Sequence, residues 1–195
     1  MRISGGKSRG ITLRCPRGQK TRPAADAVRE ALFSSLGSRV EACRFVDLFA
    51  GTGAYGLEAW SRGAAGGTFV EYDFESVRCI KENMSQVAKS ANLDDSALEL
   101  VRSDVFRWQA FEEHAYDIVF ADPPYASFPQ VAPDLFNLGN RLLKKDGMLV
   151  VEKPADLELD PVGWILVNRL GKKRGSGPSV ALWMRESFGD LDSQD

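Results

Sequence analysis

Cysteine and histidine are scarce in this chain of 195 residues, which contains three cysteines and one histidine. Cys15, Cys43 and Cys79 lie far apart and form no C-x-x-C pair, so the sequence favours neither a disulfide framework nor a zinc site. The single histidine, His114, gives little support to a His-rich metal site or a Ser-His-Asp relay. We therefore expect a protein without a bound metal.

Long apolar runs are also missing. No segment approaches the ~18 consecutive apolar residues that a membrane span needs, and the N-terminus lacks the apolar core of a signal peptide. These absences predict a cytoplasmic protein with no membrane partner. Apolar residues make up 44% of the chain and charged residues 27%, which is typical of a globular protein, and the length favours one domain.

Acidic residues are absent from the first 25 positions, which carry seven lysines and arginines. The other 170 residues carry 18 basic and 27 acidic side chains, so a basic arm precedes an acidic body. This asymmetry predicts a polyanionic partner at one end of the molecule. A solvated basic tail explains the charge alone equally well. The candidate contacts to a polyanion are Arg2, Lys7, Arg9, Arg14, Arg17 and Lys20.

Apolar runs separated by helical periods dominate the chain from residue 44 onward. Strands are expected at 44–50, 68–72, 98–102, 116–121 and 148–152, with helices between them. This alternation predicts an α/β fold with a doubly wound, parallel sheet. Two further runs, 164–170 and 180–185, have no helix-length segment between them and predict an antiparallel hairpin at the sheet edge. The expected sheet is thus seven-stranded and mostly parallel.

The chain before this sheet predicts a small hairpin or ordered arm, followed by a helix that Pro23 opens and Gly37 closes. We divide the protein accordingly. Residues 1–40 form the basic arm and helix on the substrate side, residues 41–186 form the main domain, and residues 187–195 form an acidic tail that we expect to be disordered.

A glycine-rich loop follows the first expected strand. Gly51, Gly53 and Gly56 fit the spacing G-x-G-x-x-G, with Thr52 inside the loop and Glu71 twenty positions after Gly51. Such a loop lets a ligand approach the backbone, and the helix that follows offers free N–H groups. The motif alone does not separate a nicotinamide dinucleotide from S-adenosylmethionine, because both present a ribose to the acid.

Two acidic residues stand at the ends of the next strands. Glu71 is placed to accept both hydroxyls of a ribose. Asp104 follows the third strand, where it can accept from an adenine amino group, or cap a helix expected over 105–111, or do both.

The fourth strand ends in the most specific signal of the chain, Asp122-Pro123-Pro124-Tyr125. The two prolines stiffen the turn and remove two backbone donors, so the Pro123 carbonyl can face a cleft. Together with the Asp122 carboxylate, it forms a paired acceptor for an –NH2 group. Tyr125 adds a flat face on which a base can stack.

Several motifs together resemble a known family. They are Arg2-Ile3-x-Gly5-Gly6-x-x-Arg9-Gly10, Arg22-Pro23-x-x-Asp26-x-Val28-Arg29-Glu30-x-Leu32-Phe33, Asp47-x-Phe49-Ala50-Gly51-x-Gly53-x-x-Gly56-Leu57-Glu58-Ala59, Ser61-Arg62-Gly63-Ala64, Asp122-Pro123-Pro124-Tyr125 and Val151-Glu152. The chain resembles S-adenosylmethionine-dependent amino-methyltransferases with a D/N-P-P-Y/F motif. Within that class it is similar to the bacterial family that methylates the 2-amino group of one guanine in 16S (small-subunit) ribosomal RNA.

The resemblance implies a Rossmann-like methyltransferase fold, S-adenosylmethionine as cofactor and S-adenosylhomocysteine as product. It places the methionine end of the cofactor over the Gly51–Gly56 loop and near Thr21, Arg22 and Pro23, with Asp47 and Val105 in the same site. It gives Glu71 the ribose, Asp104 the adenine, and Asp122, Pro123, Pro124 and Tyr125 the target base. The sequence departs from the family at Ala24-Ala25 and at Gly175-Ser176-Gly177-Pro178.

The resulting prediction is a monomeric guanine-N2 methyltransferase whose basic arm binds 16S ribosomal RNA, either naked or within small-subunit particles. Methylation of another amine in RNA, DNA or a protein is an alternative. A nicotinamide-dependent oxidoreductase would leave Asp122 to Tyr125 unexplained, and a non-enzymatic RNA-binding module would leave the strand-end residues unexplained.

Overall fold

Seven strands and four α-helices make up the fold in the computed structural model, which describes residues 1–16, 23–172 and 178–186. The helices are α1 (Pro23–Leu36), α2 (Ala54–Ser61), α3 (Phe74–Ala91) and α4 (Phe128–Leu142), with short 3₁₀ turns at Gly37–Val40 and Asp95–Ala97. The strands are β1 (Arg44–Leu48), β2 (Gly66–Glu71), β3 (Leu98–Arg102), β4 (Tyr116–Ala121), β5 (Leu143–Pro154), β6 (Trp164–Gly171) and β7 (Pro178–Arg185).

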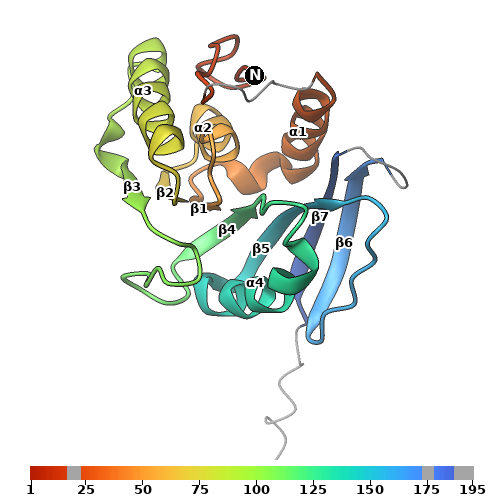
Figure 1. Ribbon diagram of the computed structural model, residues 1–195. Coiled ribbons are helices and arrows are strands. Elements are labelled where there is room, and N and C mark those ends of the chain that lie inside the picture. Colours follow the sequence, from red (N-terminus) through yellow and green to blue (C-terminus); the bar gives the residue numbers. More distant parts are fainter. Residues whose placement is uncertain (17–22, 173–177, 187–195) are drawn as a thin grey trace, which may run out of the picture.

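The strands form one sheet in the order β3-β2-β1-β4-β5-β7-β6 (Figure 1). The first five strands in this order run parallel, whereas β7 is antiparallel to both β5 and β6. The predicted fold class is confirmed, including the C-terminal hairpin. The order reverses between β1 and β4, and a sheet of this kind binds its ligand at the carboxyl ends of the strands beside such a switch point.

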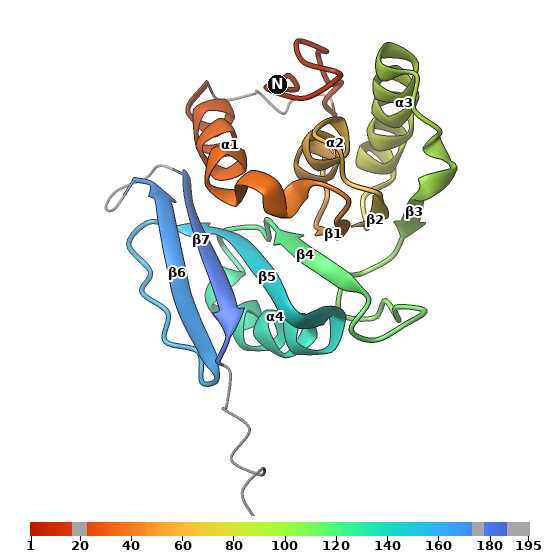
Figure 2. The ribbon, with the colours of Figure 1, turned by 180° about the vertical axis from the view of Figure 1, so that it is seen from behind.

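Helices cover both faces of the sheet (Figures 1 and 2). The α1, α2 and α3 helices share one face and bury side chains such as Phe33, Leu57 and Ile80 against it. The α4 helix covers the other face, where Leu135 and Trp164 belong to a second apolar core. Two cores separated by one sheet are the expected architecture of a doubly wound protein.

The N-terminal arm, described over residues 1–16, lies over α2 and between α1 and α3 (Figure 1). Ile3 and Leu13 are buried in the first core. The Ser4 hydroxyl donates to Glu58 Oε1 at 2.8 Å, and the Ser8 backbone N–H donates to Ser61 Oγ at 2.9 Å. In place of the expected hairpin, the described part of the arm has a single antiparallel bridge between Arg2 and Thr12.

The structure corrects three expectations about the main domain. No helix spans 105–111: Asp104 starts a single helical turn, in which the Trp108 N–H donates to the Asp104 carbonyl at 2.9 Å, and the chain then continues irregularly to β4. The first strand ends at Leu48 rather than at residue 50. The fifth strand begins at Leu143 rather than at residue 148, with a register shift opposite the start of β4.

Within the ranges that the structure describes, no helix is both long and apolar enough to cross a membrane.

Candidate functional site

A cleft of about 480 Å³ opens at the carboxyl ends of β1, β2, β3 and β4. This volume suits a small-molecule ligand. The cleft gathers eight of the residues that the sequence singles out, and they come from all four of these strand ends. They are Gly51, Glu71, Asp104, Val105, Asp122, Pro123, Pro124 and Tyr125.

Glu71 ties the glycine loop to the turn after β2. Its Oε2 atom accepts a hydrogen bond from the Gly51 N–H at 2.7 Å, and its Oε1 atom accepts from the Asp73 N–H at 2.8 Å. Gly51 has a φ of +57°, a conformation that glycine adopts without strain, and only the Phe49 carbonyl lies within 4 Å of its missing side chain. The loop is therefore open toward the cleft at Gly51. Each Glu71 oxygen keeps a second lone pair for a ligand.

The other loop glycines, Gly53 and Gly56, also have a packing role. A side chain at Gly56 would meet the Phe69 and Phe45 rings at 2.4 and 2.5 Å, and one at Gly53 would point at Leu57 and Phe69. Both glycines thus let α2 pack closely on the sheet. Their predicted role in cofactor binding stays a prediction.

Asp47 lies beneath the loop and does not line the cleft. The residue is 1% exposed, and its Oδ2 atom accepts from the Gly56 N–H at 2.9 Å. Desolvation by burial raises the pKa of Asp47 to about 8, helped by the negative charge of Glu71 and opposed by the Gly56 hydrogen bond. In this structure Asp47 supports the loop from inside the protein.

Thr52 is buried as well, and it faces the arm. Its hydroxyl donates to Met1 Sδ at 3.2 Å, and its carbonyl accepts from Asn83 Nδ2 at 2.9 Å. The same Asn83 amide binds the Arg14 backbone on both sides, with its Oδ1 atom 2.7 Å from the Arg14 nitrogen and its Nδ2 atom 3.0 Å from the Arg14 carbonyl. One side chain therefore fixes the arm to the glycine loop.

Asp104 and Val105 form the wall that β3 contributes. The Asp104 Oδ1 atom accepts from the backbone N–H groups of Phe106 and Arg107 at 2.9 and 3.2 Å. It thus caps the turn, as its alternative role predicted, although no helix follows. No hydrogen bond to its Oδ2 atom occurs among the described residues, which leaves that oxygen for a donor in the cleft.

The Asp122-Pro123-Pro124-Tyr125 turn forms the opposite wall. The Pro124 carbonyl accepts from the Ser127 N–H and hydroxyl, both at 3.1 Å, whereas the Pro123 carbonyl accepts no hydrogen bond from the described residues. Tyr125 is 39% exposed, and its hydroxyl donates to Glu152 Oε1 at 2.9 Å. The turn thus brings together a carboxylate, a carbonyl that accepts no hydrogen bond from the described residues, and an aromatic ring.

The Asp122 carboxyl lies in an acidic environment. The residue is open to the cleft, yet desolvation by the surrounding protein raises its pKa well above the usual range, and the charges of Glu152 and Asp47 raise it further. Such perturbed carboxyl groups in a cleft are typical of functional sites. Asp122 is accordingly the candidate reactive carboxyl group of this cleft.

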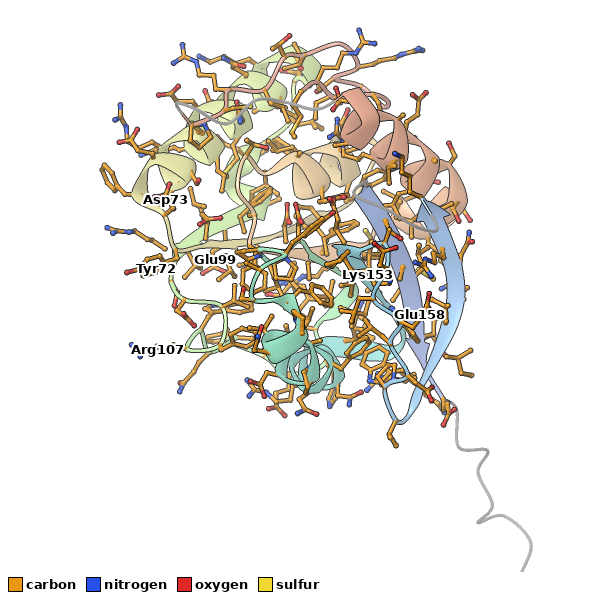
Figure 3. All side chains as sticks on the ribbon, turned by 45° about the vertical axis from the view of Figure 1, so that its right-hand side comes forward. Tyr72, Asp73, Glu99, Arg107, Lys153 and Glu158 are labelled. Carbon is orange, nitrogen blue, oxygen red and sulfur yellow. The ribbon has the colours of Figure 1, made fainter. Side chains whose placement is uncertain are left out.

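Four cleft residues escaped the sequence prediction: Phe49, Tyr72, Asp73 and Ser76. Tyr72 and Asp73 follow β2 directly and lie at the edge of the molecule in Figure 3, where Tyr72 is 71% exposed. Asp73 caps α3 by accepting from the Ser76 N–H at 2.8 Å. Their position directly after Glu71 is the signal that could have identified them.

The predicted polyanion contacts divide into described and undescribed residues. Arg2, Lys7, Arg9 and Arg14 are exposed on the arm, and Arg14 pairs with Glu82 at 2.6 Å. Arg17 and Lys20, together with the predicted cofactor contacts Thr21 and Arg22, lie outside the described residues, as does the side chain of Pro23. The expected acidic tail, 187–195, also lies outside them.

The arrangement can bind a nucleoside and hold an amine. Acceptors at Glu71 and Asp104 stand along one wall, and the paired acceptors of Asp122 and Pro123 stand along the other. Across residues 1–16, 23–172 and 178–186, no group of three or more His, Cys, Asp or Glu side chains is placed to hold a metal ion.

Comparisons with known proteins agree with this geometry. A family model described as "Conserved hypothetical protein 95" matches residues 1–180. "Putative rRNA methyltransferase YlbH" from Bacillus subtilis (strain 168) is 34% identical over 175 residues, covering 87% of this chain and 91% of the relative. "Ribosomal RNA small subunit methyltransferase D" from Escherichia coli (strain K12) is 32% identical over 197 residues, covering 99% and 94%.

A solved structure of a related protein is similar to this chain over nearly its whole length. "Putative methyltransferase yhhF from Escherichia coli" superposes with a TM-score of 0.77 at 30% identity, covering 95% of this chain and 98% of its own. The resemblance seen in the sequence motifs is confirmed, and it extends over the whole sheet and the arm.

Proposed function

The chain belongs to the family described as Conserved hypothetical protein 95, and from this membership we propose that it transfers a methyl group to the exocyclic 2-amino group of one guanine in 16S ribosomal RNA. S-adenosylmethionine is the methyl donor. The names of the curated relatives support the class of reaction and an RNA substrate. The choice of the guanine 2-amino group comes from the family resemblance seen in the sequence motifs, and the paired acceptors of the cleft suit an exocyclic amine.

The observation that carries the proposal is the placement of Asp122 and the Pro123 carbonyl opposite Glu71 and Asp104 in one cleft. The residues of the wall with Glu71 and Asp104 suit the cofactor. Glu71 would accept from the ribose hydroxyls, Asp104 Oδ2 would accept from the adenine amine, and Val105 would pack against the base. Gly51 leaves room for the methionine end. When bound, S-adenosylmethionine supplies an electrophilic methyl group.

The residues of the other wall act on the amine. The Asp122 carboxylate and the Pro123 carbonyl each accept one hydrogen of the 2-amino group, which favours a pyramidal nitrogen and exposes its lone pair. The negative charge of Asp122 offsets the positive charge that develops on this nitrogen. After the nitrogen has accepted the methyl group, the Asp122 carboxylate would take the proton that it releases, and the demethylated cofactor would be S-adenosylhomocysteine. Tyr125 stacks on a guanine that has been splayed out of the RNA fold.

The first prediction concerns the product. Incubating the protein with labelled S-adenosylmethionine and hypomethylated small-subunit RNA, both naked and in particles, is expected to label one guanosine as N2-methylguanosine. Digestion and nucleoside mapping identify it. Label on a different amine would overturn the guanine assignment, and label in no RNA would overturn the RNA substrate. A parallel titration with S-adenosylmethionine and NADH tests the cofactor, and preferential NADH binding would contradict it.

In this proposal residues 1–40 form the RNA-binding side, residues 41–186 form the methyltransferase domain, and the protein acts as a monomer in the cytoplasm. The exposed arm residues Arg2, Lys7, Arg9 and Arg14 supply cations for the RNA backbone, together with Arg17 and Lys20. Asn83 holds the end of the described arm against the glycine loop, so RNA bound by the arm lies beside the cleft.

The second prediction tests the arm. Reversing the charge at Lys7 and Arg9 is expected to weaken RNA binding and to reduce the slope of log K against log salt by about 1 for each lost phosphate contact. Affinity for S-adenosylmethionine should stay unchanged, because neither side chain lines the cleft.

A matched control reverses the charge at Arg39 and Lys145, which are equally exposed but lie beside the amino ends of β1 and β4. This control should keep the salt slope of the wild-type protein. An equal change of slope in both double variants would show a general charge effect and would contradict the assignment of the arm.

A further inference from the structure

Glu152 on β5 connects the target-base turn to the protein interior. Its Oε1 atom accepts from the Tyr125 hydroxyl at 2.9 Å, and its Oε2 atom accepts from the Tyr55 hydroxyl at 2.7 Å. Tyr55 belongs to α2, and its ring stacks on Phe120 of β4 with centroids 5.6 Å apart and an interplanar angle of 12°. A single carboxylate thus joins residues 97 and 27 positions away in the chain.

The register of the sheet places Glu152 beside Asp122. Ala121 of β4 pairs with Val151 of β5, so the residues that follow each of them point to the face that α2 covers. Lys153 points to the opposite face, where it is buried and its Nζ atom donates to the carbonyls of Pro154 and Leu157 (Figure 3). The end of β5 is therefore fixed on both faces.

We propose that Glu152 is a positioning residue, which holds the Tyr125 ring in place for the incoming guanine and shares the acidic environment of Asp122. The inference rests on the proposed function and gives Glu152, which is not among the residues that line the cleft, a role in binding the target base. A tyrosine fixed at its hydroxyl loses little side-chain freedom when a base stacks on its exposed face, so the base is captured at lower entropic cost.

The two hydrogen bonds explain why a carboxylate stands here. A carboxylate offers an acceptor oxygen to each tyrosine, whereas an amide offers one acceptor and one donor group. Glu152→Gln keeps the size of the side chain but leaves one acceptor oxygen for two donating hydroxyls, so one bond is kept only if its direction reverses and the amide N–H donates to a tyrosine oxygen. It also removes one of the negative charges that oppose ionisation of Asp122.

The ionisable groups around Asp122 determine how a substitution of Glu152 changes the pH dependence of the methylation rate. Burial, Glu152 on β5 and Asp47 on β1 raise the Asp122 pKa. The neighbouring Tyr55 on α2 stays protonated because burial and the charges of Glu152 and Asp122 raise its own pKa. Arg29 on α1 acts on Tyr55 in the opposite direction. Since the reaction uses the Asp122 carboxylate, the rate falls as the pH drops through the Asp122 pKa.

The third prediction follows for Glu152→Gln. We expect the KM for RNA to rise about 3- to 10-fold, a part of the stacking contribution of one aromatic residue, with unchanged affinity for S-adenosylmethionine. The acid limb of the pH-rate profile should move to lower pH. Tyr125→Phe keeps the ring and the Glu152 charge, so it should reproduce the rise in KM without moving the acid limb. In the double variant the KM effects should overlap rather than multiply.

Glu158→Gln is the matched control, because Glu158 is 79% exposed and pairs with Arg169 away from the cleft (Figure 3). It should change neither KM nor the acid limb. KM effects that multiply in the double variant, or an acid limb that stays in place in Glu152→Gln, would overturn the positioning role.

A measurement on the free protein separates this inference from the proposed function. The chain has four tyrosines, so ring signals of ¹³C-labelled tyrosine are readily assigned by NMR. Glu152→Gln should shift the signals of Tyr55 and Tyr125 and leave Tyr72 and Tyr116 in place. Unmoved Tyr125 signals would overturn the inference even if the wild-type protein methylates RNA. Absence of RNA methylation with the expected shifts would overturn only the proposed function.

Discussion

Replacing Asp122 by Asn is expected to slow methyl transfer about 100-fold, the usual effect of removing one preorganised electrostatic group. The variant keeps the size of the side chain and one acceptor oxygen, so the RNA can still place its amine at the turn. It loses the negative charge that offsets positive charge on the reacting nitrogen. Single-turnover methylation with saturating S-adenosylmethionine and RNA measures this step directly.

The environment of Asp122 provides controls for this result. Asn carries no charge beside Glu152 and Asp47, so the variant should be at least as stable as the wild-type protein, and its rate should lose the acid limb that Asp122 imposes. Asp134→Asn, on the exposed surface of α4, makes the same chemical change far from the cleft and should be silent. A near-wild-type rate for Asp122→Asn would falsify the proposed mechanism.

Asp47→Asn is expected to stabilise the protein by a few kcal/mol at pH 9 and by much less at pH 5. The pKa of buried Asp47 is raised from its ordinary value of 3.8 to about 8, so between these values the folded protein holds a proton that the unfolded chain releases. Stability from this group is therefore complete below about pH 4 and is lost as the pH rises to about 8. The difference in pKa sets an upper limit of roughly 6 kcal/mol.

The asparagine side chain avoids this loss because it carries no charge and can still accept from the Gly56 N–H. Denaturant unfolding of both proteins at several pH values gives their free energies of unfolding. Contributions of all other ionisable groups cancel when the two values at one pH are subtracted. Asp134→Asn again serves as the control. A difference that is independent of pH would show that Asp47 is ionised in the folded protein at neutral pH.

Local patterns in the sequence predict most of the cleft, because parallel strands bring their carboxyl ends to one edge. Glu71 and Asp104 lie within two residues of the ends of their predicted strands, and the Asp122 turn follows its strand directly. Their meeting could therefore be expected without knowing the strand order. The short helical turn at Asp104 shows the limit of this reasoning. Its cap and the buried Val105 and Trp108 are real helix signals, but they extend over one turn only.

Contacts between distant segments could not be predicted in this way. Gly56 fits a nucleotide-binding pattern by spacing, yet what requires glycine there is the pair of rings from Phe45 and Phe69. Glu152 reads as an ordinary strand residue until Tyr55 and Tyr125 are placed beside it by the sheet and by α2. Both cases depend on side-chain packing across elements, for which a single sequence contains no periodic signal.

The position of β7 determines when the sheet can be completed during translation. This strand is the last of the described strands in chain order, yet it lies inside the sheet between β5 and β6, and its Val180 pairs with Glu152. While a ribosome is still translating residues 178–185, the nascent chain exposes an unpaired β5 edge, a surface prone to aggregation. The strand that carries Glu152 gains its second neighbour only after β7 has been synthesised, so a chain truncated before β7 would contain the glycine loop and the Asp122 turn but leave β5 unpaired on one side.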